Sequence, residues 1–136
     1  MLLGTQHAMI VHSDGLDEIR LDADTTVVEL QGGAITSYTI QPSDLPISTH
    51  SPAALAALTA QSSDESLQLV REALGDETSA AADIVSLNAG AAIYVAGVAE
   101  TLRDGVVMAK DAIASGLANQ RLEELVATSS LMAEQN

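Results

Sequence analysis

The first third of the chain is patterned as strands. The unbroken apolar run at 8–11 is typical of a strand buried on both faces, as in a parallel sheet. β-Branched residues dominate 25–30 and 34–40, and the two glycines between these runs predict a hairpin turn. Residues 1–47 are therefore expected to form a buried strand, a loop and an antiparallel hairpin. The hairpin shows no candidate chemistry.

Residues 48–136 are expected to be helical. A capping box that starts at Ser62 predicts an amphipathic helix over 63–74. The segment 79–99 is apolar nearly all round, which predicts a central buried helix. Two more helices are expected, over 102–115 and 117–133. In the last one, three residues are expected to face the core: Leu122, Leu125 and Val126.

Two polar residues of the helical part invite a functional role but are not assigned one. Asn88 interrupts the apolar segment, and a buried asparagine is more often satisfied by the backbone of a loop than used as a ligand. His50 stands beside a short alanine-rich segment and is expected at the surface.

Candidate chemistry is concentrated in VHSDGLDEI, Val11 to Ile19, which leaves the first strand. Asp17 and Glu18 lie just beyond the carboxyl end of that strand, where open α/β sheets place their ligands. Mg²⁺ is commonly held by one or two carboxylates together with the phosphates of a substrate. The pair is therefore a candidate Mg²⁺ site. Two other interpretations stay open: a solvated acidic turn, and a zinc site that adds His12 and Asp14.

Charge excludes several classes of partner. The formal net charge is −14 over 136 residues, and the five basic residues are scattered. Nucleic acids and anionic membranes are bound mainly through clustered Lys and Arg, so neither is an expected partner. The chain has no cysteine, hence no disulfide and no thiolate ligand. No segment has the pattern of a signal peptide or a membrane span, and we expect a soluble, cytoplasmic protein.

Four segments resemble a known family. They are HAMIVHSDGLDEIRL, TTVVELQGGAITSYTIQPSDLPI, ALGDETSAAADIVSLNAGAAIYVAG and AETLRDGVVMAKDAIASGLANQRLEELVA. In this order they are similar to the last third of the anthranilate phosphoribosyltransferases, members of glycosyltransferase family 3 with a nucleoside-phosphorylase-like fold. The resemblance covers essentially the whole chain. It implies an α/β fold, namely the carboxy-terminal part of the large phosphoribosyltransferase domain.

The resemblance also implies an activity and a cofactor. Members transfer phosphoribosyl from phosphoribosyl pyrophosphate to anthranilate in tryptophan biosynthesis, with inversion at the anomeric carbon. The positions that match Asp17 and Glu18 help to hold Mg²⁺ on the pyrophosphate. The family's GTGGD, NxST and KHGN segments, its anthranilate-binding residues and its N-terminal helical domain have no counterpart here. We therefore expect a carboxy-terminal fragment that is inactive alone and that self-associates or forms a homo-oligomer.

A second hypothesis belongs to another class of function. The chain could be a non-catalytic acidic interaction module, or a related binding protein that shares the fold. The charge of −14 disfavours a version that binds nucleic acid. An upstream reading frame with the GTGGD and KHGN segments would favour the enzyme.

Overall fold

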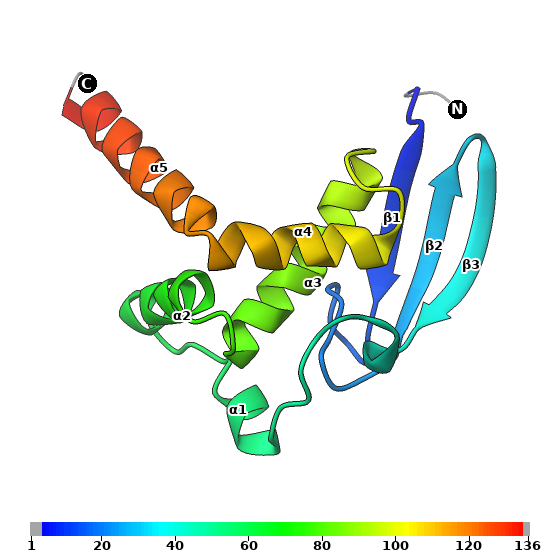
Figure 1. Ribbon diagram of the computed structural model, residues 1–136, viewed down its shortest axis with the longest axis horizontal. Helices are drawn as coiled ribbons and strands as arrows, with labels where there is room; N and C mark the ends of the chain where they lie inside the picture. Colours follow the sequence, from blue (N-terminus) through cyan, green and yellow to red (C-terminus); the bar gives the residue numbers. More distant parts are fainter. Residues whose placement is uncertain (1–3, 135–136) are drawn as a thin grey trace.

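A computed structural model describes residues 4–134 as a small sheet packed on helices (Figure 1). The predicted α/β class, with a strand, an antiparallel hairpin and a helical second part, is confirmed. The elements, in chain order, are β1 (His7–His12), β2 (Thr25–Gln31), β3 (Ala34–Ile40), the 3-10 helix η1 (Pro42–Asp44), α1 (Pro52–Ala56), α2 (Ser63–Gly75), α3 (Ala80–Val95), α4 (Leu102–Ala114) and α5 (Leu117–Glu134).

The hairpin forms where the sequence predicts it. β2 and β3 are antiparallel and are joined by Gly32 and Gly33, whose φ angles of 57° and 86° suit a type I′ turn. Side chains alternate between the two faces of β2, so that Val27 is buried while its neighbour Val28 is exposed. One face of β2 is therefore buried and the other faces outward, whereas β3 is exposed along its length except at Ile40.

β1 is less buried than its apolar sequence predicts. It pairs antiparallel with β2, with Val11 opposite Val27, and the sheet order is β1-β2-β3. In residues 4–134 no strand occupies its other edge, so the expected parallel pairing is absent. Ile10 points to the outer face and is 71% exposed. Burial on both faces needs a layer on each side, and here the helices cover only one.

Side-chain caps start the main helices. The Ser62 hydroxyl accepts a hydrogen bond from Glu65 N–H before α2, and Ser79 and Thr101 cap α3 and α4 in the same way. The core lies between the sheet and the crossing of α3 with α4, and its buried apolar cluster comprises Ile19, Val27, Ile40, Leu45, Leu87 and Val106. α3 is thus central, as expected, although its outward side is not buried and Val85 is 40% exposed.

α5 departs from the prediction. It extends away from the other helices beyond α4 (Figure 1), and two of its three supposed core residues are exposed, Leu125 at 66% and Val126 at 56%. An amphipathic stripe reveals which side of a helix could be covered, but the covering element has to exist nearby. Within residues 4–134, no helix, α5 included, has the length and apolar character needed to cross a bilayer.

α3 and α4 cross at a pair of glycines. A Cβ atom added to Gly105 would lie 2.3 Å from the carbonyl oxygen of Gly90, and one added to Gly90 would lie 2.6 Å from the backbone of Val106. Both distances are far below van der Waals contact. The two main chains can approach this closely only because neither residue has a side chain.

We expect Gly105→Ala to lower the free energy of unfolding by about 2–3 kcal/mol, because the new methyl group must push two helix backbones apart. Gly75→Ala, at the end of α2, is the matched control, since nothing lies within 4 Å of its added Cβ. It should be neutral or stabilise by about 0.5–1 kcal/mol. Urea unfolding of the two variants checks this, and equal stabilities would contradict the tight crossing.

Candidate metal-binding loop

The acidic loop begins with a tight turn after β1. Asp14 and Gly15 have φ angles of 45° and 85°, as in a type I′ turn. The flanking residues exchange two backbone hydrogen bonds: Ser13 N–H donates to the Leu16 carbonyl (2.9 Å), and Leu16 N–H donates to the Ser13 carbonyl (3.0 Å). The sequence Asp-Gly therefore reverses the chain immediately before the two candidate carboxylates.

Both ends of the loop are tied to the body of the protein. On one side, the buried Ser13 hydroxyl donates to the Asp24 carbonyl at 2.8 Å. On the other, Ile19 is 1% exposed, and its N–H and carbonyl both bond to the Asn88 side chain. The prediction that a loop backbone satisfies Asn88 is confirmed.

Asp17 and Glu18 themselves are open to solvent. The Asp17 side chain is 97% exposed, and His12 Nδ1 lies 3.9 Å from its Oδ1. In residues 4–134 the Glu18 side chain forms no hydrogen bond or ion pair. Two open, adjacent carboxylates fit a Mg²⁺ ion that keeps several waters and takes its remaining ligands from a phosphorylated substrate. Their assignment as metal ligands stays a prediction.

The zinc alternative receives no support from the described residues. Among residues 4–134, no group of three or more His, Asp or Glu side chains is arranged so that it could hold a metal. Protein zinc sites need three or four such ligands. Asp14 is instead directed to Arg20, whose Nη1 lies 3.5 Å from Asp14 Oδ2.

Arg20 is not available to bind a substrate phosphate. Its Nε and Nη2 donate to the two carboxylate oxygens of Asp22, each at 2.8 Å. This hydrogen-bonded guanidinium holds the pKa of Asp22 below its usual value. The basic residue nearest to the candidate metal ligands in sequence is therefore already neutralised.

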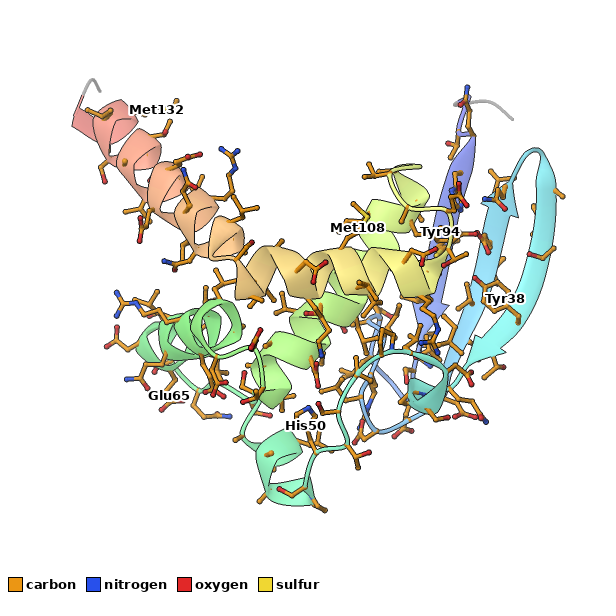
Figure 2. All side chains as sticks on the ribbon, in the orientation of Figure 1. Tyr38, His50, Glu65, Tyr94, Met108 and Met132 are labelled. Atoms are coloured by element: carbon orange, nitrogen blue, oxygen red, sulfur yellow. The ribbon has the colours of Figure 1, made fainter. Side chains whose placement is uncertain are left out.

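The hairpin contains a buried carboxylate that was not predicted from the sequence. Glu29 is 6% exposed, and it accepts hydrogen bonds from Tyr38 (2.8 Å), Tyr94 (2.8 Å) and His7 Nε2 (2.7 Å). Tyr38 comes from β3 and Tyr94 from α3, both labelled in Figure 2. Burial raises the pKa of Glu29, but these hydrogen bonds outweigh it and leave the pKa lowered. The signal in the sequence was the alternation along β2: Glu29 lies on the same face of the strand as Thr25 and Val27, which are buried.

A second buried carboxylate lies on α3, and it overturns the prediction for His50. Asp83 is fully buried and accepts from Lys110 Nζ (2.6 Å), His50 Nε2 (2.8 Å) and Ser48 N–H (2.8 Å). The His50 side chain is only 10% exposed, so it is not a surface residue (Figure 2). A loop histidine could not be assigned to a buried partner 33 residues away from sequence alone.

Comparison with known proteins assigns the chain to a family. The model described as "Glycosyl transferase family, a/b domain" matches residues 1–119, so the chain belongs to this family of glycosyl transferases. Among curated proteins, anthranilate phosphoribosyltransferase of Cellvibrio japonicus is 50% identical over 130 residues, which are 92% of this chain and 37% of that protein. The enzyme of the same name from Ectopseudomonas mendocina is 45% identical over 139 residues, 98% of this chain and 39% of that protein.

Solved structures agree with the sequence relatives. Anthranilate phosphoribosyltransferase from Thermus thermophilus superimposes with a TM-score of 0.75 at 32% identity, over 89% of this chain and 35% of that one. The Saccharomyces cerevisiae enzyme in complex with PRPP and Mg matches with a TM-score of 0.73 at 21% identity, which shows a shared fold. The chain thus spans less than two-fifths of the length of the relatives it matches.

The two buried carboxylates predict how stability depends on pH. Burial raises the pKa of Asp83, but hydrogen bonds from Lys110, His50 and Ser48 N–H outweigh it, so the folded pKa lies below the unfolded value, as it does for Glu29. Their stabilising contribution is complete above about pH 5 and is lost as pH falls through the lowered pKa values. The free energy of unfolding should therefore decrease steadily from pH 5 towards pH 2.

Asp83→Asn tests one of these two contributions. It leaves Lys110 and His50 without their carboxylate, and we expect it to cost about 2–4 kcal/mol at pH 7 and much less at pH 2–3. Asp111→Asn, an exposed carboxylate on α4, is the control for the change in net charge. Urea unfolding at several pH values checks both, and a constant difference between wild type and Asp83→Asn would contradict the linkage.

Proposed function

We propose that this chain is part of an anthranilate phosphoribosyltransferase, and that Asp17 and Glu18 hold the Mg²⁺ that accompanies phosphoribosyl pyrophosphate. The observation that carries the proposal is an exposed pair of adjacent carboxylates on a loop fixed at both ends, in a chain of this family. The names of the relatives support the transferase activity, and the Mg and PRPP of the yeast complex support the cofactor and the donor substrate.

The role proposed for this chain in the reaction is electrostatic stabilisation. When phosphoribosyl transfers to the amine of anthranilate, negative charge develops on the departing pyrophosphate. Bound Mg²⁺ supplies the positive charge that stabilises it. Asp17 and Glu18 would contribute oxygen ligands, and the anchored backbone would keep them in place through the reaction. No side chain of the loop is asked to act as a nucleophile.

The same assignment implies a domain, a pathway, a location and an acceptor substrate for this chain. Residues 1–136 would be the carboxy-terminal part of the α/β phosphoribosyl-transfer domain, acting in tryptophan biosynthesis in the cytoplasm. Anthranilate would be the acceptor, in line with the 4-fluoroanthranilate named for a yeast structure of the same fold. Self-association of the chain stays a prediction. The uncovered outer face of the sheet, with Ile10 and Ile35 more than 70% exposed, is the surface that favours it.

Neutralising the two carboxylates should impair catalysis but not folding. In the full-length enzyme we expect Asp17→Asn with Glu18→Gln to lower kcat/KM by about a hundredfold or more and to raise the Mg²⁺ requirement, because the metal loses both ligands from this loop. The unfolding midpoint should stay unchanged, since both side chains are exposed.

The chain provides a matched control for this experiment. Glu123 and Glu124 are also adjacent and exposed, but they lie on α5, so Glu123→Gln with Glu124→Gln changes the net charge equally. Steady-state kinetics at several Mg²⁺ concentrations compare the two double variants. Equal Mg²⁺ dependence of both would remove the acidic loop from the mechanism.

We expect the 136-residue chain by itself to have no measurable phosphoribosyltransferase activity. Transfer requires the phosphate cradle, the metal and the acceptor pocket to be held in register, and this chain supplies only the candidate metal ligands. The purified chain can be assayed with both substrates and Mg²⁺. Turnover close to that of an intact enzyme would show that the chain contains a complete site.

A further inference from the structure

We propose that Asn88 is the positioning residue for the metal-binding carboxylates: it holds the backbone of the acidic loop so that Asp17 and Glu18 face the ion in a fixed geometry. This inference rests on the function proposed above. It concerns a residue that touches neither the metal nor the substrate and acts through the loop alone.

The carboxylates cannot fix their own position. Asp17 has only His12 nearby, at 3.9 Å, and Glu18 contacts no polar partner within the described residues. Their placement is therefore set by the backbone between Ser13 and Ile19. On the Ser13 side, the Asp14-Gly15 turn separates the anchor from the carboxylates, so the anchor at Ile19 lies closer to them in the chain.

The Asn88 side chain forms hydrogen bonds with both backbone polar groups of Ile19. The Asn88 Oδ1 accepts from Ile19 N–H at 2.9 Å, and Asn88 Nδ2 donates to the Ile19 carbonyl at 3.0 Å. The Ile19 N–H belongs to the planar peptide group that joins Glu18 to Ile19. Holding that plane restricts the position of the Glu18 Cα. It therefore also restricts the direction in which the Glu18 side chain leaves the loop.

Only an amide of this length provides the required pair of groups. The second hydrogen of Asn88 Nδ2 donates to the Ile84 carbonyl, one turn earlier on α3, at 3.0 Å. The side chain thus acts as one acceptor and two donors in a single orientation. Aspartate is isosteric, but its carboxylate would face the carbonyl oxygens of Ile19 and Ile84 without a proton to donate.

The support beneath Asn88 is rigid. Its neighbour Leu87 is fully buried, and Gly90, two residues further on, lies against the backbone of α4. A flexible support could not transmit position to the loop, whereas a helix locked at a glycine crossing can. Groups that orient metal ligands typically change metal affinity by roughly 10–100-fold when removed.

Mn²⁺ is a suitable probe of this geometry in the 136-residue chain, because it broadens NMR signals near its binding site even when binding is weak. The measurement is the Mn²⁺ concentration that halves the amide signals of Asp17 and Glu18. It is compared in wild type, in Asn88→Ala, in the double variant Asp17→Asn with Glu18→Gln, and in Ile113→Ala. Ile113 is buried on α4 outside the apolar cluster that contains Ile19, so its variant controls for lost stability. The signals of Glu123 and Glu124 report unspecific Mn²⁺ binding.

We expect Asn88→Ala to raise that concentration about tenfold and to speed hydrogen exchange of the Ile19 amide, while Ile113→Ala leaves both unchanged. A wild-type Mn²⁺ response in Asn88→Ala, or an equal loss in Ile113→Ala, would overturn the positioning role. Wild-type broadening in the Asp17/Glu18 variant would instead overturn the metal site itself, so the two failures are distinguishable. If Asn88→Ala does not fold, Asn88→Ser takes its place, because a hydroxyl cannot reach both backbone groups of Ile19. A folded Asn88→Ser with a wild-type response would equally contradict the proposal.

Discussion

The close crossing of α3 and α4 at Gly90 and Gly105 is the constraint on which the remaining structure depends. It fixes α3. In turn, α3 holds the non-helical segments through three polar side chains at different positions along its axis. Asp83 binds the loop that contains Ser48 and His50, Asn88 binds Ile19, and Tyr94 binds Glu29 in the sheet. An apolar helix alone would bury surface without selecting one register. The three hydrogen-bonding side chains select it, because a shift of α3 would leave buried polar groups unpaired.

The distribution of charge explains why the open loop suits a cation. Four of the five basic residues of the chain are already engaged with acceptors of the chain: Arg20, Arg103, Lys110 and Arg121. The two most buried carboxylates, Glu29 and Asp83, are saturated with hydrogen-bond donors. Arg71, on α2, is exposed and has no hydrogen-bond or ion-pair partner among residues 4–133, and the other unpaired charged side chains there are negative and exposed. A surface of this kind repels a bare pyrophosphate, so any phosphate substrate at this loop needs a divalent ion between it and the carboxylates.

Local signals predicted the local structure well. The hairpin follows from two β-branched runs around Gly32-Gly33, the helix starts follow from Ser62 and Thr101, and the backbone partner of Asn88 follows from the cost of burying a free amide. Tertiary pairings were not predictable in the same way. His50 and Asp83 are 33 residues apart, and no periodicity relates them. The predicted burial of the apolar side of α5 was wrong for a related reason, because amphipathicity marks one side of a helix but does not identify the element that covers it.

The candidate site combines the two kinds of information. The role of Asp17 and Glu18 as metal ligands stays a prediction, although both could be proposed from the sequence because they follow an apolar strand. The rigidity of the loop could not, because that depends on Asn88, 69 residues beyond Ile19. Elsewhere in the described chain, well-held carboxylates such as Asp83 and Glu29 are buried and fully paired. Asp17 and Glu18 instead combine a loop anchored at Ser13 and Ile19 with exposed side chains that form few contacts. Such an arrangement is typical of a functional site, where local rules of stability are broken for the sake of a ligand.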